Sequence, residues 1–298
     1  MILIVVFDSF IEFSFGKNLL GYGDDLYVDR IVSFFKDEPI VGSYLLGFNF
    51  IIVGYYFEKF YKKNFKLKLV LFLILFILVG CIFITGERSN GIKAIIGLMI
   101  FLFLNNKIST KIKISIFLFS LIFVGLIISN SNYLKVRYGQ QLFSQLFDNS
   151  QRDQFIENNL YLKLYKSGLA IFKDNPIFGV GNKNYRVITT KNIDTKINDK
   201  YVLNTHPHQI YIELLSEHGL VGSIILLSIF FYLIFKNLKI IILSRNSIQL
   251  GCFTYLIINF LPILPSGSFF NDFSSTLFWI NLSIMYACNK KTNIFTKY

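Results

Sequence analysis

All three histidines of the chain lie close together, immediately before an apolar segment. His206, His208 and His218 fall within thirteen residues, and the apolar segment Leu220–Phe235 follows at once. An imidazole side chain titrates near neutral pH, so it can accept or release a proton under physiological conditions. Its position beside a membrane surface suits proton transfer on a substrate carried by a lipid. We expect His208 to act as the base and His206 to contact the substrate.

The surroundings of His208 depend on where the next helix begins. If Pro207 opens that helix, His208 lies near the positive end of the helix dipole, which favours the neutral imidazole that a base requires. Glu217 would then lie nine residues on, about 180° around the helix at ~100° per residue, and would not contact His208. We expect Glu217 to pack against another helix, to pair with an arginine or to contact the substrate.

A His-x-His pair also raises the alternative of a metal site. Such a site needs a third ligand at suitable spacing. His218 lies ten residues beyond His208, and the sequence around the histidines contains no cysteine. We therefore expect neither a metal nor another cofactor.

Five arginines lie outside the basic connectors: Arg30, Arg88, Arg137, Arg152 and Arg186. All but Arg137 are taken as candidates for binding an anion. The planar guanidinium group is the side chain best suited to gripping a diphosphate and stabilising its charge. Arg88 precedes a short apolar helix, and Arg186 follows a turn whose backbone N–H groups could also face an anion. A single arginine is more often a surface charge, so the hypothesis requires two or more of them to converge.

The elements that must position these residues are apolar segments. The chain is 53% hydrophobic, with 34 phenylalanines among its 298 residues. A membrane-spanning helix needs about 20 apolar residues, and several segments approach that length. The sequence predicts an all-α, polytopic helix bundle with about seven spans, forming a single integral membrane domain over residues 1–298. The predicted spans are Ile40–Phe57, Leu69–Thr85, Gly91–Leu104, Ile114–Ser129, Leu220–Phe235, Ile248–Pro265 and Phe269–Cys288.

Much of the net charge of +12 is explained by the connectors between these spans and by the C-terminal tail. Residues 59–68, 105–113, 236–246 and 289–298 carry 5, 3, 3 and 3 Lys plus Arg, and they alternate with the spans. Basic connectors favour the cytoplasmic side. The C-terminus is therefore expected in the cytoplasm, and residues 11–39 and 130–219 outside. Nucleic-acid binding is not needed to explain the charge.

The outer loop 130–219, between the fourth and fifth spans, has room for a partly helical element. Its residues Asn158–Lys173 show near-helical apolar spacing, which predicts an amphipathic helix on the membrane surface. The run Asp174-Asn175-Pro176 should end that helix, and Gly179-Val180-Gly181 should form a turn.

These features resemble the O-antigen ligase and O-antigen polymerase superfamily. The family pattern is a His followed by Asn, Ser or Gln, then nine residues, a Gly, and a small residue or Tyr three further on. His208, Gln209, Gly219 and Gly222 meet this pattern. The runs SGLAIFKDNPIFGVGNKNY (167–185), GERSNGIKA (86–94) and SFFKDEPIVGSY (33–44) are also similar to members of the family.

The resemblance implies a glycosyltransferase of the C-type architecture in the bacterial inner membrane, multi-pass, with its active face in the periplasm. It would move a glycan from an undecaprenyl-diphosphate donor to lipid A core, to a growing glycan or to a protein, without metal or nucleotide. Carried over by residue, His208 would be the base and Arg88 would bind the donor diphosphate. The family often has an arginine ahead of the amphipathic loop helix, for which Arg152 is the nearest candidate. Members have more than seven spans, so we expect the N-terminal part to be missing.

The rival class is a transporter or flippase of lipid-linked glycans. Transporters place ionisable residues near the middle of the membrane, often on broken helices. The predicted spans contain almost none, since Lys93 and Asp272 lie near outer ends. The gathering of ionisable residues at one face favours chemistry on a lipid headgroup over transport.

Overall fold

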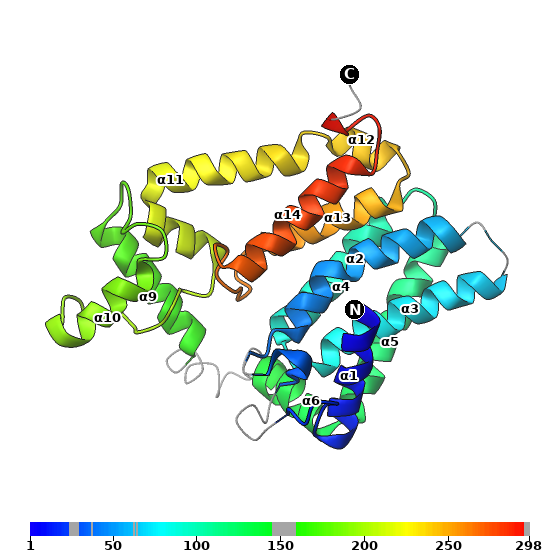
Figure 1. Cartoon of the computed structure of the whole chain (residues 1–298), viewed down its shortest axis with the longest axis horizontal. Coiled ribbons are helices and arrows are strands. Elements are labelled where there is room, and N and C mark those ends of the chain that lie inside the picture. Colours follow the sequence, from blue (N-terminus) through cyan, green and yellow to red (C-terminus); the bar gives the residue numbers. More distant parts are fainter. Residues whose placement is uncertain (24–29, 37, 62, 64, 145–158, 295–298) are drawn as a thin grey trace. The chain divides into compact units, whose positions relative to one another are not determined.

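A computed structural model describes residues 1–23, 30–36, 38–61, 63, 65–144 and 159–294. The chain divides into two compact units (Figure 1). Unit 1 comprises residues 1–144, 237–258 and 280–298, and unit 2 comprises residues 145–236 and 259–279. All regular elements in the described residues are helices. The prediction of a single integral membrane domain over residues 1–298 stays a prediction.

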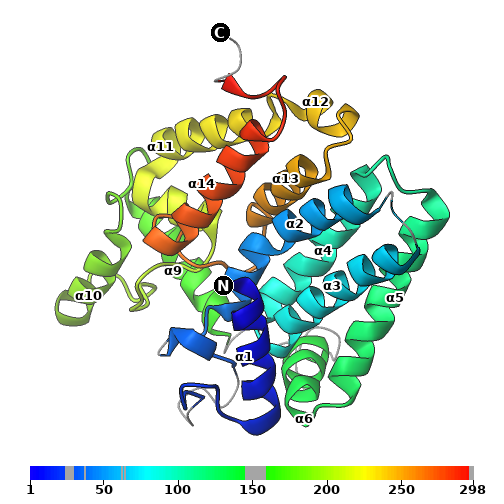
Figure 2. The same cartoon turned by 45° about the vertical axis from the view of Figure 1, so that its right-hand side comes forward.

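Unit 1 is built on a group of packed helices. Contacts join α2 to α3 and α4, and α5 to α3 and α4, and Figure 2 shows the four side by side. Leu71, Leu75 and Phe101, from α3 and α4, are at most 2% exposed and lie at the centre of this packing. The helices of this unit are α1 (Ile2–Phe15), the 3-10 helix η2 (Ser33–Phe35), α2 (Val41–Phe60), α3 (Phe65–Ile84), α4 (Arg88–Leu104), α5 (Thr110–Ser129), the short α6 (Asn132–Leu134), the π-helical η3 (Lys135–Ser144), α12 (Leu238–Leu243), α13 (Ser247–Asn259) and the second half of α14 (Asp272–Ala287).

Unit 2 consists of helices from the predicted outer loop and the helix that follows it. These are α9 (Leu160–Asp174), α10 (Tyr185–Thr195), α11 (Ile210–Phe235) and the first half of α14. Both α9 and α10 contact α11. A small core of Ala170, Ile171, Tyr185 and Tyr201 joins α9 to α10 and the segment after it. The part of the loop from α9 to Tyr201 is therefore folded around apolar residues of its own.

Every predicted span coincides with a helix, but some boundaries differ. The helix at the third predicted span begins at Arg88 rather than Gly91, so it covers 17 residues. The helix at the sixth ends at Asn259 and not at Pro265. Pro262 and Pro265 lack the N–H that continues a helix, which accounts for the earlier end. Among the described residues, three stretches are long and apolar enough to cross a membrane: Lys66–Ile84, Thr110–Ser129 and Ile210–Leu243.

The amphipathic loop helix is confirmed, with boundaries close to those predicted. Helix α9 begins at Leu160, where the Asn159 side chain caps it by accepting a hydrogen bond from the Leu162 N–H (3.1 Å). It ends at Asp174, and Gly179 and Gly181 adopt φ angles of 66° and 96° in the turn that follows. These positive φ values are the conformation for which glycine is suited.

Candidate active site

The loop that carries His206 and His208 leads into a capped helix, α11, which contains His218. Gln209 is the N-cap of α11, and its side-chain oxygen accepts a hydrogen bond from the Ile212 N–H at 2.8 Å. Pro207 does not open the helix, because His208 has a φ of 56°, outside the right-handed helical region. The helix therefore begins at Ile210, and His208 precedes it by two residues.

His208 lies among aromatic rings and is fixed through its backbone. Its ring centroid is 3.9 Å from that of His206 and 5.6 Å from that of Tyr161, which meets it edge-on from α9. Its carbonyl accepts a hydrogen bond from the Ser266 N–H at 2.9 Å. A left-handed backbone at a non-glycine residue stores strain, which persists only where the surroundings hold it. Residues with such strain cluster at active sites and ligand-binding segments.

His206 is held in the neutral form. Its pKa is lowered to about 4, mainly by burial and then by the nearby His208 and Arg186, while a backbone hydrogen bond to Ser266 opposes the shift. Its Nδ1 lies 2.9 Å from the Thr205 hydroxyl. A neutral imidazole packed against His208 adds no positive charge that would discourage His208 from accepting a proton.

Helix α11 is broken at Gly219, and the break is filled by the segment after α9. Gly219 has φ 62° and ψ −168°, and the break frees backbone groups on either side of it. The N–H groups of Val180 and Gly181 donate to the carbonyls of Ser216 (3.1 Å) and Glu217 (2.7 Å). In return, Leu220 and Val221 donate to Pro176 (2.8 Å) and Ile177 (3.2 Å). Residues 176–181 are thus bonded to α11 on both sides of the break.

This pairing requires glycine at position 219. A Cβ there would lie 2.4 Å from the Ile177 carbonyl carbon and oxygen, and its φ, ψ region is almost restricted to glycine. We expect Gly219→Ala to destabilise the pairing by ~1–3 kcal/mol, the usual cost of holding a residue other than glycine in that φ, ψ region. Hydrogen exchange at the amides of residues 176–181 should accelerate accordingly.

The matched control for this prediction is Gly125→Ala in α5, where a Cβ would meet nothing within 4 Å. Alanine is the better helix former, so this variant should leave exchange unchanged. Equal exchange in both variants and the parent protein would show that the pairing does not depend on Gly219.

Gln209, Glu213 and Glu217 recur every four residues from the N-cap of α11 onward. Gln209 caps the helix itself, while Glu213 and Glu217 each fix a different segment. The Glu217 carboxylate accepts hydrogen bonds from the N–H groups of Lys183 (2.8 Å) and Tyr185 (3.3 Å), where α10 begins. Its expected packing role is thus observed, while its place in a substrate site stays a prediction. Glu213 accepts from the Ser268 hydroxyl and from the Phe269 N–H at 3.0 Å. Sequence reasoning missed Glu213, although the four-residue spacing could have revealed it.

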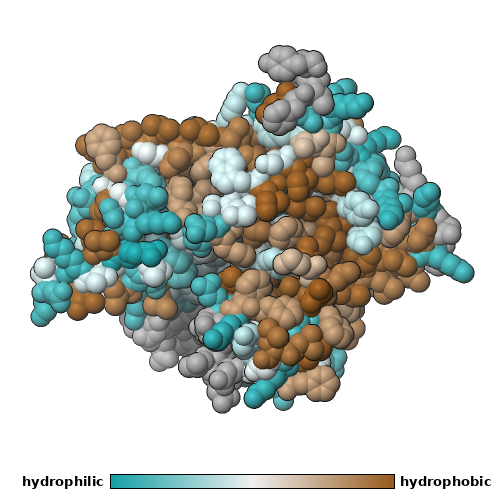
Figure 3. All heavy atoms as spheres, viewed as in Figure 1, coloured by the Kyte–Doolittle hydropathy of each residue, from teal (hydrophilic) through white to brown (hydrophobic). Residues whose placement is uncertain are grey.

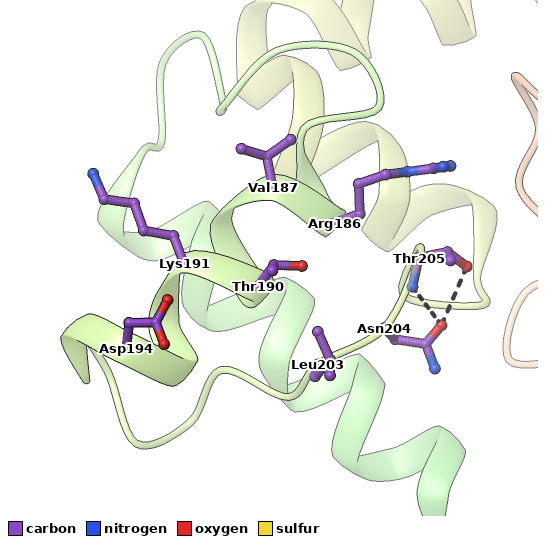
Figure 4. Close-up of a pocket in the computed structure, with 8 residues that line it drawn as sticks. All are labelled: Arg186, Val187, Thr190, Lys191, Asp194, Leu203, Asn204 and Thr205. Atoms are coloured by element: carbon purple, nitrogen blue, oxygen red, sulfur yellow. Dashed lines mark hydrogen bonds between the residues drawn. The ribbon is translucent and has the colours of Figure 1, made fainter.

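An open cavity of about 840 Å³ lies between α10 and residues 203–205, directly before the histidine loop (Figure 4). Its hydroxyl, amide and guanidinium groups are the hydrogen-bonding groups that a sugar needs, and Leu203 and Val187 offer apolar contact. In Figure 4 the Arg186 side chain extends away from Lys191, toward the Thr205 end of the cavity. The lining residues are Arg186, Val187, Thr190, Lys191, Asp194, Leu203, Asn204 and Thr205.

In unit 1, the start of α4 gathers charged groups around Arg88. Nη1 of Arg88 donates to the Gln141 carbonyl at 2.5 Å. Arg137, 6% exposed, donates from Nε and Nη2 to the Gly86 carbonyl and from Nη1 to the Gln141 side chain. Arg137 was not among the predicted site residues. Arg137 therefore holds the turn that ends at Arg88, and both guanidinium groups bond to Gln141 of η3.

Glu87, the N-cap of α4, interacts electrostatically with Arg30, so Arg30 also lies near the start of α4. Its carboxylate accepts from the Gly42 N–H and the Asn90 amide, both at 2.5 Å. Burial raises the pKa of Glu87 to about 7, and these hydrogen bonds and the charge of Arg30 oppose that rise. Arg30 and Arg88 thus lie near one carboxylate in unit 1, whereas Arg186, His206, His208 and Glu217 belong to unit 2. Arg152 lies outside the described residues.

The sequence between α3 and α11 matches a family model. The O-antigen ligase model covers residues 73–227, just over half of the 298 residues. The chain belongs to the O-antigen ligase family. The match includes Arg88, Arg186, His206, His208 and Glu217, while Arg30 precedes it. No curated protein and no solved structure matched the chain.

Membership of the O-antigen ligase family confirms the resemblance seen in the sequence. The family is one of membrane enzymes, so the protein is an enzyme of membrane glycan transfer whose substrates are lipid-linked glycans in general. Within the described residues, no three His, Cys, Asp or Glu side chains converge to hold a metal ion. The roles of the individual site residues stay predictions.

Proposed function

We propose that the protein transfers a glycan from an undecaprenyl-diphosphate donor to a hydroxyl acceptor on the periplasmic face of the bacterial inner membrane. The arrangement is a multi-pass bundle of about seven spans, similar to C-type glycosyltransferases, with a cytoplasmic C-terminus and loop 130–219 in the periplasm. The observation that carries the proposal is the position of His208. It packs against a neutral His206 directly ahead of α11, one of the helices long and apolar enough to cross a membrane.

In the proposed reaction, the acceptor hydroxyl gives its proton to His208 while its oxygen attacks C1 of the donor sugar. The new bond joins C1 to the acceptor oxygen, and the bond from C1 to the diphosphate oxygen breaks. Undecaprenyl diphosphate leaves toward Arg88, helped by Arg186, whose charges stabilise the anion. The donor is already activated, so positioning and charge stabilisation suffice without a metal or cofactor. Arg30, Arg152, His206 and Glu217 complete the proposed substrate site.

Three acceptors fit this chemistry: lipid A core, the growing glycan and a protein hydroxyl. Each presents a hydroxyl group that a histidine can deprotonate, so ligase, polymerase and protein O-oligosaccharyltransferase use the same proposed residues. The cavity beside Arg186 has room for a sugar of any of these acceptors. Membrane lipids are the remaining expected partner, and the proposal involves no nucleic acid.

A gene deletion in the native host separates this proposal from the flippase alternative. Loss of a transferase should leave the lipid-linked glycan unused on the outer face of the inner membrane. Loss of a flippase should leave the same glycan facing the cytoplasm. Labelling of spheroplasts with a membrane-impermeant sugar reagent reports the side directly, and plasmid-borne wild-type protein should restore the surface glycan. Accumulation only on the cytoplasmic side would overturn the proposed transfer reaction.

A further inference from the structure

Two large apolar side chains are exposed at the turn after α9. Ile177 is 58% exposed and Phe178 is 74% exposed. Leaving such side chains in water is costly, at about 25 cal/mol for each Å² of apolar surface. Neighbouring exposed apolar residues commonly mark a contact surface with protein or membrane. We refer to Ile177 and Phe178 as the apolar tip.

The apolar tip is attached rigidly to α11. The Ile177 carbonyl accepts a hydrogen bond from Val221, and its neighbour Pro176 accepts one from Leu220. Gly179 approaches the same helix so closely that a Cβ there would lie 2.5 Å from the Glu217 carbonyl carbon. The position of the tip along α11 is therefore set by backbone contacts and does not depend on a flexible linker.

The apolar tip also adjoins the exposed apolar face of α11. Beyond the break at Gly219, Leu220, Val221, Ile224 and Ile225 are 51%, 42%, 56% and 53% exposed. Figure 3 shows apolar atoms along α11. A helix of this length and hydropathy exposes such side chains to lipid. The apolar tip therefore lies beside the first exposed apolar residues of α11 after the break.

The charges around the apolar tip fit a membrane interface. Residues 175–182, NPIFGVGN, carry no charge. Asp174, whose carboxylate accepts hydrogen bonds from Asn198 and Tyr201, precedes them, and exposed lysines lie further out at Lys173 and on the other side at Lys183. An apolar centre bordered by lysines is typical of segments that insert at the headgroup level, since the ammonium groups meet lipid phosphates while the apolar side chains enter the acyl region.

We propose that Ile177 and Phe178 insert into the outer leaflet beside α11 and form a second membrane contact of unit 2. The inference rests on α11 crossing the membrane and not on the transfer reaction. Residues 176–181, which include the tip, are bonded to α11 on both sides of the Gly219 break. The inserted tip therefore fixes how far the N-terminal half of α11, and the loop containing His208, lie above the lipid headgroups.

Fluorescence quenching by lipid tests this proposal. Trp279 is the only tryptophan, so Trp279→Phe gives a silent background into which Phe178→Trp is introduced. The full chain is reconstituted in vesicles of phosphatidylcholine and phosphatidylglycerol, with or without phosphatidylcholine brominated on its acyl chains. We expect the Phe178→Trp variant to emit at shorter wavelength than free indole and to lose intensity with the brominated lipid. Ile177→Trp provides a second reporter, with the same result expected.

Ile193→Trp is the control, because Ile193 is 57% exposed in the same unit but lies on α10. It reports how much quenching exposure alone produces, and the quenching of Phe178→Trp should exceed it. Equal emission of Phe178→Trp with brominated and plain lipid would overturn the proposal. A short-wavelength emission without quenching would do the same, by showing that protein covers the tip. The readout does not require activity, so it stands apart from the outcome of the deletion experiment.

Discussion

Replacing His208 with alanine should reduce glycan transfer by about 10²–10⁴-fold, the usual contribution of a positioned general base. The His208 ring packs against His206 and meets Tyr161 edge-on, so its direction is fixed before the substrate binds. The measurement is the amount of surface glycan made by a deletion strain that carries each variant, together with the unused donor that accumulates. Transfer by His208→Ala at the wild-type rate would show that the imidazole is not the base.

Because His208 has a left-handed backbone, a second substitution, His208→Gly, is needed to interpret the effect of His208→Ala. Its φ of 56° is unfavourable for alanine and favourable for glycine. If the side chain carries the chemistry, His208→Gly and His208→Ala should be equally inactive. If the residue only shapes the loop, His208→Gly should retain activity that His208→Ala loses. The two variants together therefore separate the proton transfer from the backbone conformation.

His206→Ala is the matched control within the same loop. The pKa of His206, lowered to about 4, keeps it neutral near pH 7, and its proposed part is to pack against His208 and contact substrate. We expect this variant to lose less activity than His208→Ala, because the base itself remains. A larger loss in His206→Ala would exchange the roles of the two histidines.

The sequence predicted the elements whose ends are set by local chemistry. Asp174-Asn175-Pro176 ended α9 as expected, since proline cannot continue a helix and Asn and Asp favour turns. Pro207, in contrast, does not mark the start of the next helix. Proline is common at the first position of a helix, but here Gln209 provides the cap and α11 begins at Ile210.

The break at Gly219 could not be predicted from local sequence. Glycine is tolerated inside apolar helices, and the residues on both sides of Gly219 are compatible with a continuous helix. The break is maintained by the segment 176–181, about forty residues earlier, whose N–H and carbonyl groups replace the lost helical bonds. The contacts of Glu213 were not predicted for a similar reason. Its partners Ser268 and Phe269 lie far along the chain, on a loop after α13.

Replacing Arg88 with alanine should also reduce transfer by about 10²–10³-fold, the cost of removing one donor that stabilises developing negative charge. Arg88 is partly exposed at the start of α4, where its guanidinium can meet a diphosphate. Arg88→Lys keeps the charge but loses the planar fork, so we expect intermediate activity. Transfer by Arg88→Ala close to the wild-type level would remove Arg88 from the proposed mechanism.

Arg137→Ala distinguishes a chemical loss from a structural one. Arg137 is buried, and its hydrogen bonds to Gly86 and Gln141 hold the turn that precedes Arg88. Removing it should lower the thermal unfolding temperature of the purified protein, because a buried carbonyl loses its donors. Arg88→Ala should lower activity with a much smaller change in that temperature, since Gly86 keeps its bonds to Arg137. If the two variants lose activity and thermal stability in the same proportion, Arg88 supports the turn and another cation receives the departing diphosphate.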